Sequence, residues 1–275
     1  MEKNKKYDLI AFDMDGTLLD SQKKIRQDSL DSIHEAVEAG KIVTLSTGRC
    51  LPELRAYEKE MADIQYFICM SGALVYSNKE KKPIVTTAIP EDMVDKILKV
   101  SEEEDLMIHL LSWESVVEAD KVANIERYHM GPYKKSYESC CILAEDLRKW
   151  YRENPCPVFK LNFYCTDLEQ RDRMEKALAG SELEFAYSEE TNLECSPIGV
   201  SKAEGLRRLC AHCNIDVANT IAVGDADNDS AILKAAGLSV AMGNAAEHIK
   251  EMADLITASC DEGGCAQVIH DHLLG

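Results

Sequence analysis

Short apolar runs alternate with amphipathic segments in the first quarter of this chain, a pattern typical of α/β proteins. Three apolar runs have the length of buried strands, at residues 9–12, 42–45 and 67–70. Residues 27–39 carry apolar side chains at helical spacing and end before Gly40, a common residue after a helix. Residues 52–61 predict a second helix. The order strand, helix, strand, helix, strand predicts a parallel sheet with helices on both faces.

The rhythm changes after residue 73, and the middle third of the chain is interpreted as an inserted second domain. A turn at Asn78-Lys79 separates two strand-like segments, which predicts a hairpin leaving the sheet. Further on, the pattern predicts helices at 92–100 and 168–178 and strands at 107–111 and 158–164. Residues 119–139 have little periodicity and carry no predicted element.

The α/β rhythm resumes in the last third. Helices are predicted at 203–213, 229–236 and 246–252, and strands at 220–223, 238–242 and 255–256. A length of 275 residues allows one large domain or two smaller ones. We therefore predict a split core formed by residues 1–82 and 188–275, with an inserted α/β domain at 83–187.

Four short polar segments stand at or near the ends of predicted elements. They are Asp13-Met14-Asp15-Gly16-Thr17, Ser46-Thr47-Gly48-Arg49, Lys202 after Gly199-Val200-Ser201, and the stretch from Gly224 to Asp229. Ligands of open α/β folds bind at the carboxyl edge of the sheet, where Asp13 and Asp225 are expected. Neighbouring carboxylates repel one another unless a cation compensates, and Mg²⁺ prefers such oxygen ligands. The set predicts a magnesium-dependent phosphate-transfer site.

Each residue type suits one part of that chemistry. Asp13 is the candidate nucleophile, because a carboxylate can accept a phosphoryl group. Asp15, two residues further on, is the candidate acid for the leaving oxygen and the base for the attacking water. Gly16 permits a tight turn that brings backbone amides near the phosphate.

The remaining candidates supply positive charge and hydrogen-bond donors. Thr47, Lys202 and Asn228 are expected to donate to the non-bridging phosphate oxygens. Asp229 is expected to anchor Lys202 or a metal-bound water.

Ordinary interpretations compete with these roles. A lone Asp-x-Asp-Gly-Thr is often a solvated turn, and a lone Lys202 would be a surface lysine at a helix start. The spacing from Asp225 to Asp229 imitates a calcium-binding EF-hand loop, but Ser230 and Ala236 stand where that loop needs Gly and a carboxylate. The calcium interpretation therefore fails.

The cysteines and histidines give no second site from sequence alone. The pairs Cys140-Cys141, Cys210…Cys213 and Cys260…Cys265 lack a matching second pair, so thiols without metal are the better interpretation. His109 and His129 are expected in the core or on the surface of the inserted domain.

Charge and composition limit the partners. Hydrophobic residues make up 45% and charged residues 29% of the chain, which is ordinary for a globular enzyme. The net charge of −18 argues against nucleic acid, and a phosphorylated substrate would need a local positive focus from a metal, Lys202 and Arg49. No export signal or membrane-spanning stretch is evident, and 11 scattered cysteines indicate reduced thiols. These features predict a cytoplasmic protein.

Taken together, the motifs resemble those of the haloacid dehalogenase-like phosphatases, in particular the Cof-type group (subfamily IIB). D-x-D-G-T matches Asp13 to Thr17, the Thr of the second motif matches Thr47, G-V-S-K ends at Lys202, and G-D-x-x-N-D matches Gly224 to Asp229. The resemblance implies a Rossmann-like core with an inserted α/β cap. It also implies Mg²⁺ held by the Asp13 carboxylate, the Asp15 backbone carbonyl and Asp225, with Thr47, Gly48, Lys202 and Asn228 on the phosphate. Met242-Gly243-Asn244-Ala245 is also similar to the family's stretch after the fourth motif.

Two positions depart from the family pattern. Ser71-Gly72-Ala73 replaces the usual N-G-A, and a serine cannot make the same amide contacts. Asp261 to Cys265 replaces the usual D-G-V.

The sequence thus predicts a Mg²⁺-dependent phosphatase of small phosphorylated metabolites, such as sugar phosphates, acting through an aspartyl-phosphate. Two alternatives remain open, a phosphosugar mutase and a non-catalytic sensor of phosphorylated metabolites. The sequence does not indicate the oligomeric state.

Overall fold

The computed structural model describes residues 6–187 and 190–275, and the chain divides into two compact units. The first unit contains the chain up to Gly48, Tyr57–Thr86 and Ser201–Gly275, and the second contains Arg49–Ala56 and Thr87–Val200. The second unit thus differs from the 83–187 expected for the inserted domain: its main part begins at Thr87 and ends at Val200, and it includes Arg49–Ala56. The predicted domain boundaries stay a prediction.

The first unit is built on an eight-stranded sheet, which confirms the predicted α/β class. Its strands are β1 (Leu9–Phe12), β2 (Ile42–Ser46), β3 (Tyr66–Cys69), β4 (Leu74–Ser77), β5 (Lys82–Thr86), β12 (Thr220–Gly224), β13 (Leu238–Ala241) and β14 (Leu255–Ile256). The order is β14-β13-β12-β1-β2-β3-β4-β5. The pairs from β14 to β3 are parallel, and the β4–β5 hairpin adds an antiparallel edge.

The register of the three central strands aligns their carboxyl ends. Phe12 at the end of β1 lies opposite Leu45 of β2 on one side and opposite Val223 of β12 on the other. Residues that follow these strands therefore emerge at one edge of the sheet, where open α/β folds bind ligands.

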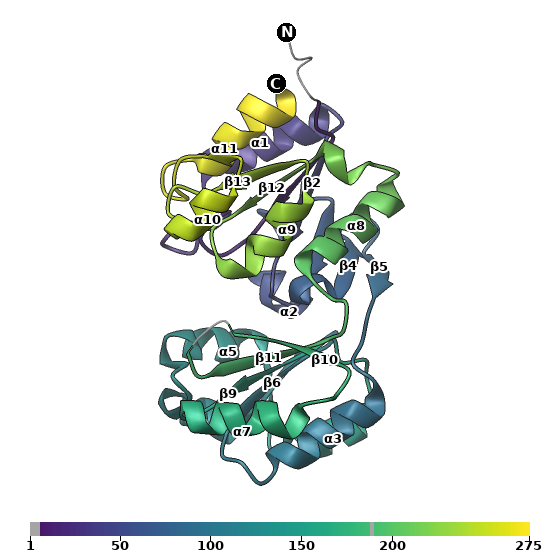
Figure 1. Ribbon diagram of the computed structural model, residues 1–275, viewed down its shortest axis with the longest axis vertical. Coiled ribbons are helices and arrows are strands. Elements are labelled where there is room, and N and C mark those ends of the chain that lie inside the picture. The colour runs from purple at the N-terminus through teal and green to yellow at the C-terminus, as the bar shows by residue number, and fades with distance from the viewer. Residues whose placement is uncertain (1–5, 188–189) are drawn as a thin grey trace. The chain divides into compact units, whose positions relative to one another are not determined.

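Helices cover both faces of this sheet (Figure 1). They are α1 (Gln27–Glu38), α8 (Lys202–Cys213), α9 (Ser230–Ala235), α10 (Glu247–Met252), α11 (Gly264–Val268) and a terminal π-helical segment (Ile269–Leu274). α8 packs against α9 on one face, and α1 packs against α11 on the other. The predicted helix over 52–61 is only the four-residue α2 (Leu51–Leu54) and a 3₁₀ turn (Arg55–Tyr57).

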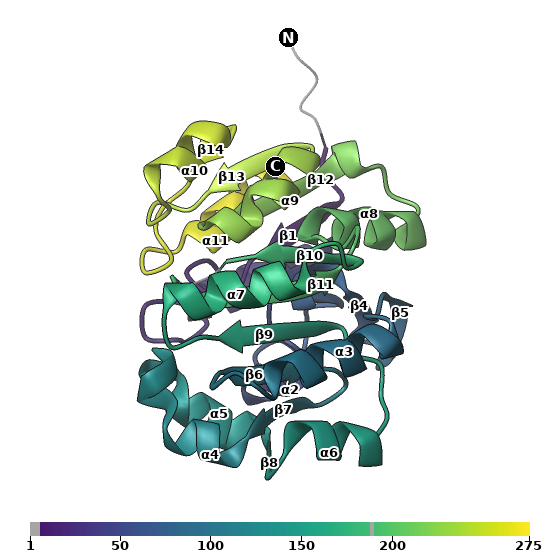
Figure 2. The ribbon, with the colours of Figure 1, turned by 60° about the horizontal axis from the view of Figure 1, so that its bottom comes forward.

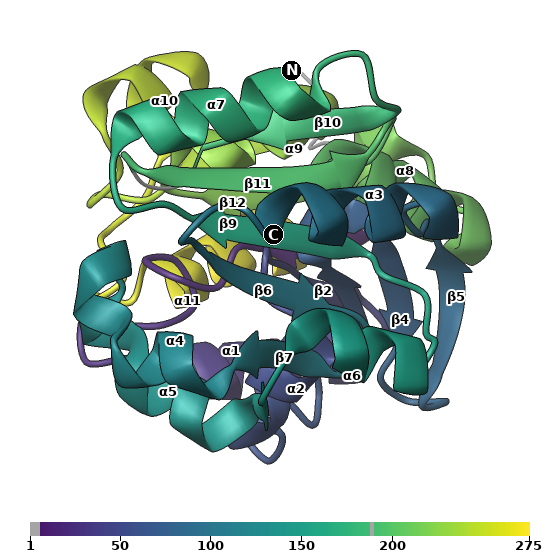
Figure 3. The ribbon, with the colours of Figure 1, turned by 90° about the horizontal axis from the view of Figure 1, so that it is seen from below.

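The second unit has its own six-stranded sheet, seen in Figures 2 and 3. Its strands run in the order β10-β11-β9-β6-β7-β8 and are β6 (Met107–Leu111), β7 (Ser115–Glu118), β8 (Ile142–Ala144), β9 (Lys160–Tyr164), β10 (Leu183–Ala186) and β11 (Asn192–Pro197). α3 (Glu91–Ser101), α6 (Leu147–Glu153) and α7 (Leu168–Leu178) share one buried apolar cluster with this sheet. The predicted elements β6, β9, α3 and α7 are confirmed, whereas β7, β8, β10, β11 and α6 were not predicted.

The segment without a predicted element, 119–139, forms short helices. They are α4 (Ala119–Ala123), a 3₁₀ turn (Ile125–Tyr128), a second 3₁₀ turn (Gly131–Tyr133) and α5 (Lys134–Cys140). Elements of three to seven residues are too short to establish a helical period, so the hydrophobic pattern could not reveal them.

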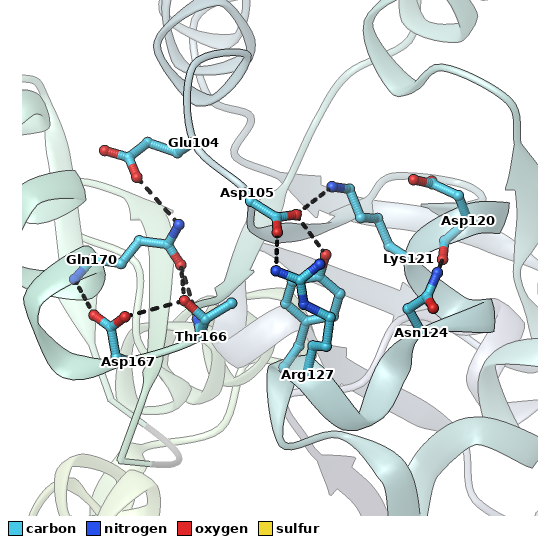
Figure 4. A network of polar contacts seen from close by, with 10 residues as sticks. Glu104, Asp105, Asp120, Lys121, Asn124, Arg127, Thr166, Asp167 and Gln170 are labelled. Atoms are coloured by element: carbon cyan, nitrogen blue, oxygen red, sulfur yellow. Dashed lines mark hydrogen bonds and ion pairs between the residues drawn. The ribbon is translucent and has the colours of Figure 1, made fainter.

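Asp105 fastens this segment to the start of β6 (Figure 4). Its carboxylate accepts hydrogen bonds from Lys121 Nζ and from the Tyr128 hydroxyl, each at 2.9 Å, and it forms an ion pair with Arg127. These three partners lower the pKa of Asp105, the Lys121 hydrogen bond most of all. This carboxylate therefore holds α4 and the turn Ile125–Tyr128 in place, together with the buried apolar cluster to which Val122, Ile125 and Tyr128 belong.

Two glycines let α8 approach the turn after β3 very closely. A Cβ atom at Gly72 would lie 2.0 Å from the carbonyl oxygen of Ser201, and one at Gly205 would lie 2.4 Å from Cγ2 of Ile68. Gly72 also has a φ of +106°, which L side chains rarely adopt. These contacts fix the amino end of α8, which begins at Lys202.

Among the described residues, no helix has the length and apolar character required to cross a bilayer.

Gly205→Ala is expected to destabilise the protein although alanine favours helices. The new methyl group would overlap Ile68, and overpacking of this kind costs about 1–3 kcal/mol. The free energy of unfolding from urea denaturation measures the effect. Ala211→Gly, at an exposed position of the same helix, calibrates helix propensity at up to about 1 kcal/mol. An increase in stability for Gly205→Ala would contradict the close approach.

Candidate active site

Three carboxylates meet at the carboxyl edge of the first unit's sheet. Oxygen atoms of Asp13, Asp225 and Asp229 all lie within 4.8 Å of one another, which makes them a group that could hold a metal ion. Asp13 directly follows β1, where its backbone N–H donates to Val223 of β12 at 2.9 Å. Asp225 directly follows β12. The parallel register thus brings together two residues that are more than 200 positions apart.

Lys202 lies between two of these carboxylates. Its Nζ atom is 2.6 Å from Oδ1 of Asp13 and 2.7 Å from Oδ1 of Asp229, and the residue is only 2% exposed. Ser201 caps α8 by accepting the backbone N–H of Glu204, so Lys202 occupies the first turn of the helix. Removal of one partner from a buried ion pair typically costs about 3–5 kcal/mol.

Asp229 is held by protein donors on both of its oxygens. Oδ1 accepts Lys202, and Oδ2 accepts the backbone N–H groups of Asp225 at 3.0 Å and Ala226 at 3.2 Å. Gly224 makes room for this carboxylate, because a Cβ atom there would lie 2.5 Å from Cγ of Asp229. Asp229 is therefore better placed to support Lys202 and the 225–226 loop than to bind a metal directly.

Gly16 and Thr17 shape the position of Asp225. Gly16 has a φ of +82°, and a Cβ atom there would lie 2.4 Å from Oδ2 of Asp225. The Thr17 hydroxyl donates to Oδ1 of Asp225 at 2.8 Å, and Asn244 Nδ2 donates to the Gly16 carbonyl at 2.8 Å. The sequence had suggested no role for the hydroxyl of Thr17. In the sequence, Thr17 stood out only as a member of the first motif, and Asn244 only as part of the stretch 242–245.

The Asp15 carboxylate lies outside the three-carboxylate group. It forms an ion pair with Lys23 at 2.7 Å, and the two side chains are 40% and 56% exposed. Exposed pairs of this kind contribute only about 0–1 kcal/mol, so the contact is readily released. Lys23 was not a candidate from sequence, because one lysine in the polar loop 20–24 gives no signal of its own.

The second motif adjoins the turn after β3. Thr47 is buried, its N–H donates to Ile68 at 2.8 Å, and its carbonyl accepts the N–H of Ser71 at 3.0 Å. Ser71 has a φ of +56°, in the left-handed region. Asparagine, which the family pattern usually has at this position, adopts this region more often than serine. Gly48 is the last residue of this segment in the first unit, and Arg49 belongs to the second unit. Asn228 is exposed in the 3₁₀ turn Asp227–Asp229.

Burial and mutual repulsion disfavour the charged forms of the central carboxylates. Burial raises the pKa of Asp13 to about 7, Asp229 and Asp225 act in the same direction, and Lys202 opposes them. Burial also raises the pKa of Asp225 to about 6, against the Thr17 hydrogen bond. The pKa of Lys202 is raised above its ordinary value by Asp13 and Asp229 despite burial. Three ionised carboxylates and one lysine leave a net charge of −2, which a divalent cation would balance.

The arrangement of three carboxylates and a buried lysine at the carboxyl edge of a parallel sheet suits a hydrolase, and comparison with known proteins shows which family the chain belongs to. A family model described as haloacid dehalogenase-like hydrolase matches residues 10–269. YkrA of Bacillus subtilis (strain 168) is 30% identical over 268 residues, 96% of each chain. The 5-amino-6-(5-phospho-D-ribitylamino)uracil phosphatase YcsE of the same strain is 28% identical over 273 residues, 97% of this chain and 96% of its own.

A solved structure shows the same similarity. A haloacid dehalogenase-like hydrolase from B. subtilis matches with a TM-score of 0.82 and 27% identity, and the match covers 96% of this chain and 99% of that one. The chain belongs to the haloacid dehalogenase-like hydrolases and is a phosphoric monoester hydrolase. The resemblance to Cof-type phosphatases is thereby confirmed.

In the absence of metal, the stability of the protein is expected to fall as pH rises from about 4 to about 7. The unfolded chain releases the Asp13 and Asp225 protons near the ordinary value of 3.8, whereas the folded protein holds them until about 7 and 6. The folded state therefore binds more protons in this window, so the free energy of unfolding decreases. Denaturant unfolding in chelator, at several pH values, measures the slope.

Asp13→Asn removes one of the two titrating groups and should make this slope shallower. Mg²⁺ should restore stability at pH 7 to 8 in the native protein, because a cation binds the deprotonated carboxylates. Identical slopes for the native protein and Asp13→Asn would contradict the raised pKa of Asp13.

Proposed function

We propose that the protein is a Mg²⁺-dependent phosphatase that hydrolyses small phosphorylated metabolites through a phosphorylated Asp13. The observation that carries the proposal is the buried lysine bridge from Asp13 to Asp229, beside the carboxylate of Asp225. This bridge positions one carboxylate and supplies a cation next to it. An attacking group and a phosphate-binding charge are the two things that phosphoryl transfer requires.

The residues present fit a magnesium ion. The donor set consists of carboxylate oxygens, and the net charge of −2 matches one divalent ion. Burial, and to a smaller extent the neighbouring carboxylates, raise the pKa of Asp13 and Asp225, and a bound cation would oppose both effects. Asp13, the backbone carbonyl of Asp15 and Asp225 would hold it, as the family resemblance implies. Asp229 stays behind them, because both of its oxygens already accept protein donors. When bound, Mg²⁺ would neutralise carboxylate and phosphoryl charge in the transition state.

In the first step, an oxygen of the Asp13 carboxylate forms a bond to phosphorus while the bond from phosphorus to the ester oxygen breaks. Asp15 gives its proton to the departing oxygen. Because the Asp15 carboxylate is paired with Lys23 in the structure, this pair must separate before Asp15 can act as the acid. The exposure of that pair makes the release inexpensive.

In the second step, Asp15 takes a proton from water, and the water oxygen bonds to phosphorus. The bond from phosphorus to the Asp13 oxygen breaks, which regenerates the carboxylate and releases inorganic phosphate. Thr47, Gly48, Lys202 and Asn228 are the proposed donors to the non-bridging oxygens in both steps. Lys202 has the strongest support, because its position next to Asp13 is fixed by Asp229.

The proposed substrates are small phosphomonoesters, such as sugar phosphates and related metabolites. YcsE supports this choice, since its name records a phosphorylated ribitylamino compound as its substrate. The net charge of −18 supports the prediction that nucleic acid is not a partner. The cytoplasmic location stays a prediction, and all 11 cysteines are free thiols in the structure, as expected for it.

Phosphate release from a panel of phosphorylated metabolites tests the proposal. Release should require Mg²⁺, stop with chelator, and fall by at least about a thousandfold in Asp13→Asn, because the amide cannot accept the phosphoryl group. Asp31→Asn, an exposed carboxylate of α1, serves as the control and should leave the rate unchanged.

Other outcomes of the same panel separate the alternatives. Conversion of one hexose phosphate into another without phosphate release would indicate a mutase. Binding of phosphorylated metabolites without turnover would indicate a sensor. Either result would overturn the phosphatase proposal.

Asp15→Asn tests the acid separately from the nucleophile. We expect kcat/KM for an alkyl phosphate, such as a sugar phosphate, to fall by about 10²–10⁴-fold. For p-nitrophenyl phosphate the loss should be much smaller, because that leaving group departs without a proton. Steady-state kinetics with both substrates measures the difference. Equal losses for the two substrates would show that Asp15 does not protonate the leaving group.

A further inference from the structure

A short turn after the first motif presents the ammonium group of Lys23 to the carboxylate of Asp15. Nζ of Lys23 is 2.7 Å from Oδ1 of Asp15, and the two side chains are 56% and 40% exposed. A dissolved molecule can therefore reach both. Because Asp15 is the proposed acid, a cation that touches it also lies near the oxygen that departs from phosphorus.

Hydrogen bonds within the turn fix the position of Lys23. The backbone N–H of Lys23 donates to the Asp20 carbonyl at 2.9 Å. Oδ1 of Asp20 accepts the N–H groups of Gln22 and Lys24 at 2.8 and 2.9 Å. Lys23 has a φ of +59°, in the left-handed region that glycine and asparagine adopt more readily. Either of those residues would suit the turn, but neither has a cation to offer Asp15.

Two contacts from distant parts of the chain hold the same turn. The Tyr57 hydroxyl donates to the Lys23 carbonyl at 3.1 Å, and Oδ1 of Asp261 accepts the backbone N–H of Ser21 at 2.9 Å. Arg26 in turn donates to the carbonyl of Asp261 at 2.6 Å. The backbone of Lys23 is therefore fixed from both sides, and its exposed side chain can change partner while the turn stays in place.

The distances put the ammonium group beside the leaving group of a substrate. Asp15 can pass on a proton only when its oxygen lies within about 3.2 Å of the departing oxygen. Since Lys23 is 2.7 Å from Oδ1, its ammonium group then starts within about 6 Å of that departing oxygen. An anionic group next to the departing oxygen can replace Asp15 as the partner of Lys23. This exchange also separates the pair, which Asp15 needs before it can act as the acid.

We propose that Lys23 is a specificity-determining residue that binds an anionic group on the leaving part of the substrate. The favoured substrates would carry a phosphate or a carboxylate next to the scissile oxygen, as diphosphates and phosphorylated 2-hydroxy acids do. The inference rests on the proposed phosphatase function and narrows its substrate class. A leaving group without charge has no group for Lys23 to bind.

The charges of the protein show why such substrates need this lysine. The net charge of −18 repels a molecule with two anionic groups. Lys202 is buried between Asp13 and Asp229, so its charge is already shared by two carboxylates. Lys23 supplies exposed positive charge on the side of the leaving group, where it can form a charge-assisted hydrogen bond.

Hydrolysis of a diphosphate would follow the same two steps as hydrolysis of an ester. An oxygen of Asp13 bonds to the terminal phosphorus while the bond from that phosphorus to the bridging oxygen breaks. The bridging oxygen keeps the electron pair, takes the proton of Asp15 and leaves as part of a phosphate group beside Lys23. Asp15 then takes a proton from water, whose oxygen bonds to phosphorus and releases inorganic phosphate from Asp13.

Three substrates of similar size test the inference at a fixed concentration of free Mg²⁺. Ethyl phosphate has a neutral leaving group, ethyl diphosphate leaves as a phosphate, and phosphoglycolate leaves with a carboxylate. We expect Lys23→Met to lower kcat/KM at least tenfold for one or both anionic substrates and less than about threefold for ethyl phosphate. The substrate that is affected identifies the anion. Equal losses for all three substrates, or no loss for either anionic one, would overturn the inference.

Two further variants separate charge from structure. Lys23→Arg keeps the cation and should retain the preference for the anionic substrate, which a purely structural role of Lys23 would not produce. Lys24→Met, at the exposed neighbouring lysine, keeps the backbone hydrogen bonds of the turn and should change none of the three rates. A loss of selectivity in Lys24→Met equal to that in Lys23→Met would show that the turn, and not the Lys23 ammonium group, sets the preference.

Binding measurements distinguish a failure of this inference from a failure of the proposed function. No phosphate release from any substrate by the native protein would contradict the function. Calorimetry with methylenediphosphonate and phosphonoacetate, which cannot be hydrolysed, then tests Lys23 without turnover. At least one of them should bind at least tenfold more weakly to Lys23→Met than to the native protein. Equal affinities for both compounds would overturn the inference, whether or not the protein is a phosphatase.

Discussion

The candidate active site depends on one buried lysine. Lys202 is 2% exposed and touches Asp13 and Asp229 at 2.6 and 2.7 Å, so three charges share a space with almost no water. Charges in such a place are tolerated only when they are paired and further hydrogen-bonded. The backbone N–H groups of Asp225 and Ala226 supply that further support through Asp229. The loop after β12 and the start of α8 therefore position each other.

Backbone geometry makes this pairing possible. Gly72 and Gly205 allow α8 to pack tightly against β3 and its turn, which places Lys202 next to β1. Gly16 and Gly224 leave the space that the carboxylates of Asp225 and Asp229 occupy. A side chain at Gly16 or Gly224 would displace a carboxylate, whereas a side chain at Gly205 would displace the apolar Ile68. Glycine thus allows close packing at the amino end of α8, and it leaves room for the carboxylates at the edge of the sheet.

Much of the core could be predicted from sequence, because its parallel strands are continuous apolar runs that end in polar motifs. The prediction that Asp13 and Asp225 lie at the same edge of the sheet followed from this pattern alone. The second unit was harder, since β7 and β8 are strands of three to four residues, and the helical segments between them have three to seven residues. Tertiary contacts such as the Asp105 cluster decide that segment. Lys23 beside Asp15, and Thr17 beside Asp225, are side-chain pairings that no spacing in the sequence reveals.

The central claim is that Asp13 itself carries the phosphoryl group during turnover. Acid quenching of the enzyme during steady-state turnover, followed by peptide mass spectrometry, tests it directly. The account predicts a phosphorylated peptide containing Asp13, labile to hydroxylamine as acyl phosphates are, and absent from Asp13→Asn. Phosphate release by the native enzyme at full rate without any modification of Asp13, in a quench fast enough to trap an acyl phosphate, would contradict it. Water would then attack the phosphoester directly.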